Sequence, residues 1–239
     1  MSRLALNTFL IGAACLCLSA CVTRREFVVA PETGGVVIDV ATGAPVEGAA
    51  VRFAGVDAIA ATVTAADGRF ALPGLTEKRT IVAVPLGGVF RDSTLVQASA
   101  PGREEAFATA GFIQGGRPAS AIYRVTVLMF PPDAGETPLH ALMSDCTAGE
   151  EQEHALQLVG FVSAIDPESP PAWLDEDAVE ALREHLQRAL PSPGFQSCAR
   201  MNEAFAMFRA QTEPLEALAR AAYIKKLPPH LRPTAEPED

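Results

Sequence analysis

Hydrophobic residues between Gly34 and Phe130 recur at every second position in short runs, which is the period of a half-buried β-strand. Runs of this kind cover 36–40, 51–53, 59–63, 70–72, 80–84, 93–99, 105–112 and 122–130. Residues that favour turns separate the runs, and Asp67 followed by Gly68 is the strongest hairpin signal in the chain. About eight short strands with turns between them predict an antiparallel β-sandwich.

The hydrophobic period changes after Pro131 and Pro132 from two towards about 3.6 residues, which indicates a boundary between two kinds of structure. Apolar stripes at helical spacing follow at 155–165, 179–190, 198–208 and 215–223. Such stripes are typical of amphipathic helices. The sequence therefore predicts three or four α-helices, which we expect to pack on the sandwich.

Local signals predict where these helices begin and end. Thr147 with Glu150 resembles a capping box at the start of the first helix. The acidic residues that begin at Asp175 favour a second helix start through the helix dipole. Pro214 is expected to interrupt the third stripe, and Thr212 is expected to cap a last helix.

The N-terminus is a short apolar leader. The segment 4–18 follows the positive charge of Arg3 and is shorter than the about 20 residues that a membrane-spanning helix needs. The run Leu-Ser-Ala-Cys at 18–21 then resembles a bacterial lipobox. This resemblance implies that 1–20 is a signal peptide and that Cys21 carries a lipid anchor. Val22 in place of aspartate implies the outer membrane, with the protein facing the periplasm and the leaflet left open.

The chain is acidic, with a formal net charge of −10 at pH 7. Loss of the leader removes one positive charge, Arg3, and leaves −11. Affinity for nucleic acid comes largely from Lys and Arg side chains at phosphates, so this charge argues against a nucleic-acid partner. Solubility in the periplasm is the simpler explanation of the excess acid.

The five cysteines fit an envelope protein. Cys15 and Cys17 leave with the leader and Cys21 carries lipid, which leaves Cys146 and Cys198. In an oxidising periplasm these two predict a disulfide, which stabilises a loop of roughly 50 residues by about 4 kcal/mol in the chain-entropy model. The alternative, a metal-binding or catalytic thiol, would need histidines nearby, and the histidine spacing matches no zinc pattern.

A set of turn and core residues recurs early in the predicted sandwich: Gly35, Val36, Val37, Ile38, Asp39, Thr42, Gly43, Pro45, Gly48, Ala49, Val51, Thr62, Thr64, Asp67, Gly68, Phe70, Leu72 and Leu75. In this pattern the segment resembles a carboxypeptidase regulatory-like domain. The resemblance implies a transthyretin-like (prealbumin) sandwich and implies no reaction. The later strands depart from the family through a Gly- and Pro-containing loop at 111–120.

Known catalytic motifs are missing from the sequence. None of the four histidines is followed three residues later by glutamate, as in the zinc carboxypeptidases to which such domains are sometimes attached. Zincin, nucleophile-elbow and β-lactamase motifs are also missing. Tyr123 and Arg124 match the start of the terminal motif of a transthyretin-related hydroxyisourate hydrolase, but Val125 and Thr126 replace its last two residues. We therefore predict no catalytic residue, metal or cofactor.

Two weaker groupings leave alternatives open. Glu151 and His154 have the spacing of metal ligands on a helix, but such sites need ligands from other helices, and a solvated acidic first turn is simpler. His154, His185 and Cys198 could converge in the fold, or the histidines could lie on a helix surface that faces solvent. Trp173 could stack on a sugar or anchor its loop on the helical core. Three further residues are interpreted as core: Met201, Met207 and Phe208.

These patterns predict an α+β protein in which an N-terminal antiparallel β-sandwich precedes a small helical region. The expected parts are the signal peptide at 1–20, a transthyretin-like sandwich at 33–131, a helical region at 138–227 and a tail at 228–239. The tail is acidic and rich in proline, which is typical of disorder.

The predicted function is that of a lipid-anchored, non-catalytic cell-envelope lipoprotein that acts as a binding or scaffold module. Its expected partners are the membrane, through Cys21, and an envelope protein that binds exposed edges or loops. A lipoprotein of the type VI secretion apparatus is similar in anchor and predicted fold. The alternatives are an envelope hydrolase or enzyme accessory subunit with a site at His154 or His185, and a carbohydrate-binding lipoprotein, which an aromatic content of 6% disfavours.

Overall fold

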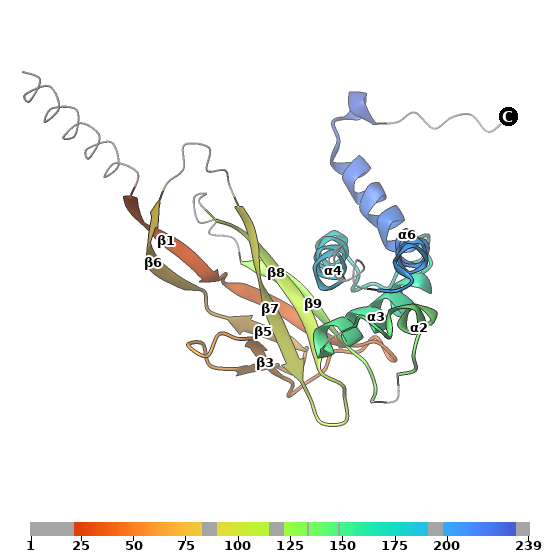
Figure 1. The fold of residues 1–239 in the computed structure, drawn as a ribbon, viewed down its shortest axis with the longest axis horizontal. Helices are drawn as coiled ribbons and strands as arrows, with labels where there is room; N and C mark the ends of the chain where they lie inside the picture. The colour runs from red at the N-terminus through yellow and green to blue at the C-terminus, as the bar shows by residue number, and fades with distance from the viewer. Residues whose placement is uncertain are drawn as a thin grey trace, which may run out of the picture.

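The computed structural model describes residues 22–82, 90–114, 122–132, 134–147, 149–190 and 198–232. Within these ranges nine β-strands precede four α-helices and a short 3-10 turn, so the chain is an α+β protein (Figure 1). The predicted signal peptide, the lipidation site Cys21 and the tail residues 233–239 lie outside the described residues.

The strands are β1 (Val22–Ala30), β2 (Thr33–Asp39), β3 (Ala50–Phe53), β4 (Thr62–Val63), β5 (Arg69–Leu72), β6 (Leu75–Val82), β7 (Phe90–Ser99), β8 (Ala106–Gln114) and β9 (Tyr123–Met129). Strands β2 to β9 overlap the hydrophobic runs of the alternating pattern. The pattern does not predict β1, because Arg24, Arg25 and Glu26 interrupt the alternation. Strand structure therefore begins before residue 33, the expected start of the sandwich.

Hydrogen bonds arrange the described strands in three sheets. One has the order β4-β3-β7-β8, the second has the order β5-β2-β9, and β1 pairs with β6 in a two-stranded ribbon. All pairs are antiparallel except β2 and β9, which run parallel from Thr33–Tyr123 to Asp39–Met129. Parallel neighbours need a long connection, and residues 40–122 provide it. The expectation of antiparallel pairing is therefore wrong for this one pair.

The two larger sheets share one hydrophobic core, to which both contribute residues on alternate positions: Val37, Val51, Phe53, Phe70, Val96, Val127 and Met129. Gly35 on β2 makes room for the Phe70 ring, since a Cβ there would lie 2.6 Å from a ring carbon. The turn at Asp67 and Gly68 leads from β4 to β5, which lie in different sheets and do not pair, so the prediction of a hairpin there is wrong. At this turn Gly68 has a φ of +72°, and the Asp67 carboxylate accepts a hydrogen bond from the Arg69 amide. Glycine adopts such a φ without steric cost.

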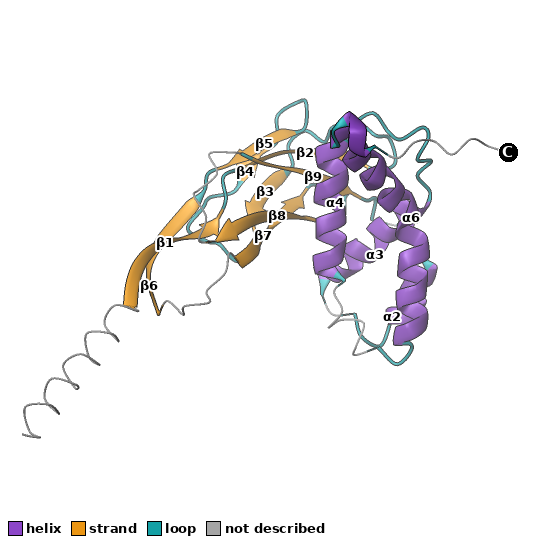
Figure 2. Cartoon of the chain, turned by 90° about the horizontal axis from the view of Figure 1, so that it is seen from above, coloured by secondary structure: helices purple, strands orange, loops and turns teal. Residues whose placement is uncertain are grey.

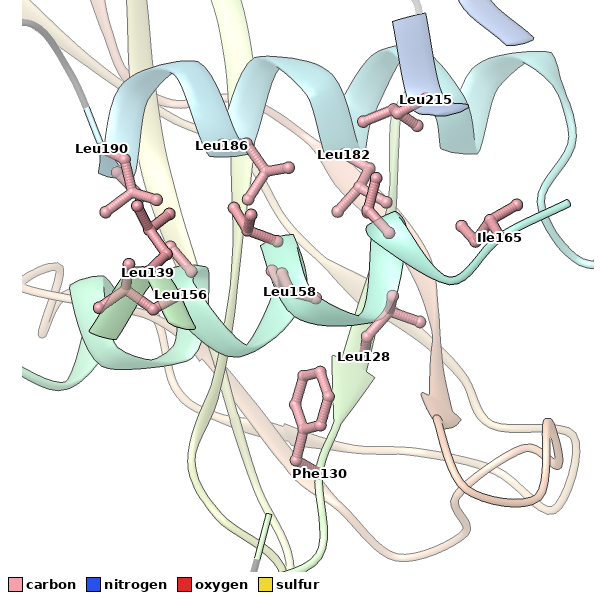
Figure 3. Packing of buried hydrophobic residues seen from close by; sticks show 14 of the residues in the cluster. Leu128, Phe130, Leu139, Leu156, Leu158, Ile165, Leu182, Leu186, Leu190 and Leu215 are labelled. Carbon is pink, nitrogen blue, oxygen red and sulfur yellow. The ribbon is translucent and has the colours of Figure 1, made fainter. Parts of the chain in front are cut away.

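The helices are α2 (Pro138–Met143), α3 (Glu150–Ser163), α4 (Glu176–Ala189) and α6 (Met201–Lys226), and the 3-10 turn η1 is Pro229–Leu231. They gather on one side of the strands (Figure 2). Their core includes Ile38 from β2 and Leu128 from β9, and Phe130 follows β9 directly (Figure 3). Strands β2 and β9 are therefore buried on both faces, and the predicted packing of helices on the strands is confirmed.

Two of the predicted helix boundaries are wrong. The Thr147 hydroxyl donates to the Met143 carbonyl instead of capping a helix, and α3 begins after Gly149. The α6 helix runs through Pro214, although proline lacks an amide hydrogen for the helical hydrogen bond. The Thr212 hydroxyl does not cap a new helix but donates to the Phe208 carbonyl, 2.9 Å away. Figure 1 shows α6 with two arms of different direction, a bend of the kind that a helical proline causes.

Candidate functional site

The two histidines singled out in the sequence lie where the two larger sheets meet. Strands β8 and β9 are edge strands of different sheets, and they run close together. Helices α3 and α4 cover this junction, and each contacts β8. His154 comes from α3 and His185 from α4, so the packing of both helices on the junction brings the two rings together.

His154 joins the two edge strands through both nitrogens of its ring. Its Nδ1 accepts a hydrogen bond of 3.3 Å from the Phe107 amide on β8. Its Nε2 donates to the Leu128 carbonyl on β9 at 2.8 Å, since a carbonyl can only accept. The side chain is buried, and the Phe130 ring packs edge-on against it with centroids 5.7 Å apart. His154 therefore connects β8 and β9 where no sheet ladder does.

His185 is buried beside His154, with ring centroids 6.1 Å apart. Its Nδ1 lies 2.9 Å from the Thr109 hydroxyl on β8. Its Nε2 is buried and has no hydrogen-bond partner among the described residues. Such an atom leaves an unmet hydrogen bond inside the protein, which has a free-energy cost.

Burial sets the protonation state of both rings. Desolvation lowers the pKa of His154 to about 4, although the hydrogen bond to Leu128 acts in the opposite direction. Desolvation also lowers the pKa of His185 to about 3, with a smaller contribution from the charge of His154. Both rings are therefore neutral at pH 7. A base with so low a pKa is a weak proton acceptor.

These positions decide between the alternatives for the histidines. The interpretation as a helix surface facing solvent is wrong, because both side chains are buried under the helices. His154 and His185 converge, but Cys198 does not join them. Cys198 lies at disulfide distance from Cys146, with Cα atoms 5.0 Å apart, which is the pairing that the sequence predicts.

The spacing of Glu151 and His154 does not produce a metal site. Backbone groups occupy both ring nitrogens of His154, so neither is free to bind a cation. Glu151 is half-buried, and desolvation raises the pKa of its carboxyl group. Within the described ranges, one group of side chains has its ligand atoms close enough together to hold a metal ion: Asp145, Cys146 and Cys198. The sulfurs of its two cysteines are paired with each other.

Two open cavities flank the histidine pair, and Thr109 lines both. One, of about 460 Å³, lies between β7, β8, α3 and α4 and is lined by Ser93, Leu95, Thr109, Glu151, Gln187 and Arg188. The other, of about 320 Å³, includes Tyr123 and Arg124, the two residues that match the start of a hydrolase motif. Neither histidine lines these two cavities, although the His185 ring contacts Thr109, which lines both. The arrangement supports a structural role for the pair.

A third cavity, of about 260 Å³, does include His154, together with Glu104, Glu105, Glu150 and Glu153. The carboxylates of Glu104 and Glu105 already accept hydrogen bonds from the side chains of Gln157 and Gln97. Two of the four carboxylates that line this cavity are therefore already engaged within the protein.

The side chains that the sequence places in the helical core divide into two groups. Trp173 stacks on Phe161 with ring centroids 6.1 Å apart, which confirms that it anchors its loop on the helical core. Met207 and Phe208 pack against the same core. The prediction is wrong for Met201, since this residue is 38% exposed on the first turn of α6.

A group of buried polar residues, which the sequence pattern does not predict, fixes the ribbon to the larger sheets. Gln114 on β8 accepts from the Val28 amide at 3.1 Å and donates to the Val28 carbonyl. The Thr94 hydroxyl on β7 donates to the Val29 carbonyl at 2.7 Å. Gln114, a polar residue on an otherwise apolar face of β8, is the signal in the sequence, but the sequence does not show which strand it meets.

Comparison with known proteins gives no family. The chain matches no protein-family model, and it shows no significant sequence similarity to any curated protein. In the described part of the chain, no helix combines the length and the apolar character that a membrane span requires. Function must therefore be argued from the residues themselves.

Proposed function

We propose that this protein is a lipid-anchored lipoprotein of the bacterial cell envelope, held at the outer membrane by Cys21 and facing the periplasm. The observation that carries the proposal is the lipobox-like run at 18–21, which ends where β1 begins at Val22. A folded strand directly after the cysteine suits a mature N-terminus at that position. The anchor then connects to the folded body without a long linker.

The proposed body is a transthyretin-like sandwich of the carboxypeptidase regulatory-like type with a helical layer on one side. Two sheets around one core, with four and three strands, support this assignment. The turn at Asp67–Gly68, which is part of the resemblance, is a tight turn through which the chain passes from β4 in one sheet to β5 in the other. In this assignment the three-stranded sheet contains one parallel pair, β2 with β9.

We further propose that the body binds a protein partner rather than catalysing a reaction. The full engagement of His154 and the depth of His185 support this, since those residues are the ones that an active site would need. The outer surface of α6 offers a contact region, because Phe205 and Tyr223 are 37% and 64% exposed. Exposed aromatic residues are typical of interface contacts.

The anchor is tested by the intact mass of the protein purified from membranes of the bacterium. Lipidation predicts a mass that corresponds to cleavage before Cys21 plus acyl chains, and retention in the membrane fraction at high salt. Cys21→Ser should abolish both, whereas Cys17→Ser, a change of the same type inside the leader, should leave both intact. An unmodified N-terminus in the wild-type protein would contradict the proposal.

The binding role is tested by site-specific photo-crosslinking in the intact envelope. A crosslinking residue at Tyr223 on α6 is compared with one at Val63 on β4, which is 62% exposed and lies in the sandwich. A single crosslinked partner from position 223 that is absent from position 63 and is lost with Cys21→Ser supports an anchored scaffold. Equal or absent crosslinking at both positions contradicts partner binding through α6.

A further inference from the structure

The β1–β6 ribbon extends from the larger sheets in the direction away from the helices (Figures 1 and 2). Its eight rungs run from Val28–Thr76 and Ala30–Leu75 near the body to Val22–Val82 at the outer end. Gln114 and Thr94 fix the inner end of β1 to β8 and β7. The outer end of the ribbon is therefore the part of the described body that adjoins Cys21.

Positive charge is concentrated at this outer end. The four outermost rungs contain Arg24, Arg25 and Arg79 and no acidic residue, while Glu26 and Glu77 stand nearer the body. Together with Lys78, the two strands carry a formal charge of +2, whereas the whole chain carries −10. The ribbon is thus a cationic region of an acidic protein.

The register also brings like charges together. Arg25 stands directly opposite Arg79, an arrangement that destabilises an antiparallel pair. Arg79 is partly compensated, because its guanidinium lies 3.1 Å from the Glu77 carboxylate and 4.5 Å from the centroid of the Phe27 ring. Among the described residues, neither Arg24 nor Arg25 has an ion-pair partner, and both are exposed.

Protection of a free strand edge against aggregation is the simplest alternative explanation of charged residues on such a ribbon. That explanation accounts for charged residues, lysine above all, at any position along the ribbon. It does not account for a gradient in which the cations stand at the outer end and the acids nearer the body. A ligand for the outer end that carries negative charge accounts for the gradient.

We propose that the outer end of the β1–β6 ribbon docks on anionic phospholipid headgroups beside the lipid anchor. This inference rests on the proposed lipidation of Cys21. A strand rises about 3.3 Å per residue, so Arg24 and Arg25 lie within about 10–13 Å of the anchor. That distance is close to the Debye length of about 8–10 Å, within which the surface charge of a membrane acts. The docked ribbon sets the orientation of the body relative to the bilayer.

The chain offers an internal probe for this contact, because its only lysines are Lys78 on the ribbon and Lys225 and Lys226 at the far end of α6. Lipidated protein purified from membranes is reconstituted in vesicles of phosphatidylcholine, alone or with about one third phosphatidylglycerol. Acylation of each lysine is then followed by mass spectrometry. We expect phosphatidylglycerol to slow acylation of Lys78 by about threefold or more. We expect no such effect at Lys225 and Lys226, and recovery at Lys78 in about 1 M salt, which screens charges beyond about 3 Å.

Two charge variants separate docking from mere proximity to the membrane. Arg24→Gln with Arg25→Gln should remove most of the protection of Lys78, whereas Arg209→Gln with Arg220→Gln removes the same charge from α6 and should leave it unchanged. Equal Lys78 rates in the two kinds of vesicle, or full protection in the ribbon variant, would overturn the proposal. The same would follow if peptidoglycan, but not anionic vesicles, protected Lys78.

The intact mass of the same preparation separates this inference from the proposed anchor. An acylated protein whose Lys78 ignores phosphatidylglycerol refutes the docking and leaves the anchor standing. A protein without acyl chains refutes the anchor and, with it, the docking beside that anchor.

Discussion

At the scale of single residues, His154 is the side chain on which the most structure depends. It satisfies the Phe107 amide and the Leu128 carbonyl, two buried backbone groups on strands that belong to different sheets. The sequence shows a histidine within a predicted helix, at a metal-ligand spacing from Glu151 that the structure does not use. Its role could not be predicted, because it depends on the distance between β8 and β9, which the packing of two sheets determines.

Replacement of His154 should therefore destabilise the protein strongly. His154→Leu leaves two buried backbone groups without partners, at about 1–3 kcal/mol each, so we expect a loss of about 2–6 kcal/mol in the free energy of unfolding. His185→Leu is the matched control, since it removes one hydrogen bond and also the unpaired Nε2. Urea unfolding of both variants provides the measurement. A smaller loss for His154→Leu than for His185→Leu would contradict the assigned role.

The two histidines also predict how stability depends on pH. Their pKa values in the folded protein, about 4 and about 3, lie below the ordinary value of 6.5. At a pH between the folded and the ordinary value, the unfolded chain therefore binds more protons than the folded protein. The full stability is present above pH 6.5 and falls as the pH decreases, by about 1.4 kcal/mol per pH unit for each histidine.

Urea midpoints measured between pH 7.5 and about 4.5 test this dependence. Carboxylates also titrate in this range, so the comparison uses the variant His154→Gln with His185→Gln, which cannot gain those protons. The variant is expected to be less stable at pH 7.5 and to lose less stability on acidification. Parallel pH profiles for the two proteins would refute the assignment to the histidines.

At the scale of elements, the caps show where local sequence rules hold and where they fail. Asp175 accepts a hydrogen bond of 2.9 Å from the Ala178 amide at the start of α4, as the acidic run predicts. Thr147 belongs to a similar motif, but its hydroxyl bonds to the end of the preceding helix α2. Short motifs name candidates for a cap, and competition with neighbouring backbone groups decides between them.

The difference between these two residues is measurable. Asp175→Ala should lower the free energy of unfolding by about 1 kcal/mol, the usual contribution of an N-cap. Thr147→Ala should cost less than about 0.5 kcal/mol, because the Met143 carbonyl already accepts from the Thr147 amide. Thermal unfolding followed by circular dichroism resolves the two changes. Equal losses for both variants would show that Thr147 acts as a cap after all.

Most strands were predictable from the alternation of hydrophobic residues. Two features of the elements were not: strand β1 and the continuation of helix α6 through Pro214. The ribbon strand β1 has the charged run Arg24 to Glu26 where alternation would need apolar residues. The helix α6 passes through Pro214 because tertiary contacts at Leu215 and the Thr212 hydroxyl bond hold both sides of the bend. In both places the surroundings in three dimensions outweigh the local preference.

At the scale of the whole molecule, the sandwich and the helices depend on each other. The sequence predicts two regions with a boundary near Pro131 and Pro132, and composition alone would allow two independent domains. The structure joins them, because Ile38, Leu128 and Phe130 complete the helical core, while their neighbours along the same strands complete the sandwich core. The boundary in the sequence therefore marks a change of secondary structure and not a boundary between two cores. Strands β2 and β9 contribute residues to the sandwich core and to the helical core.

This shared layer predicts that the protein unfolds in one cooperative step. Trp173, the only tryptophan, stacks in the helical part, so its fluorescence reports on that part. Hydrogen exchange of the amides of Val51 on β3 and Val96 on β7, two buried positions in the far sheet, reports on the sandwich. Separation of the halves would expose the helical face of β2 and β9, at about 25 cal/mol for each Å² of apolar surface. We therefore expect coincident urea midpoints for the two probes, and a sandwich that keeps its protection after the Trp173 signal is lost would show two independent units instead.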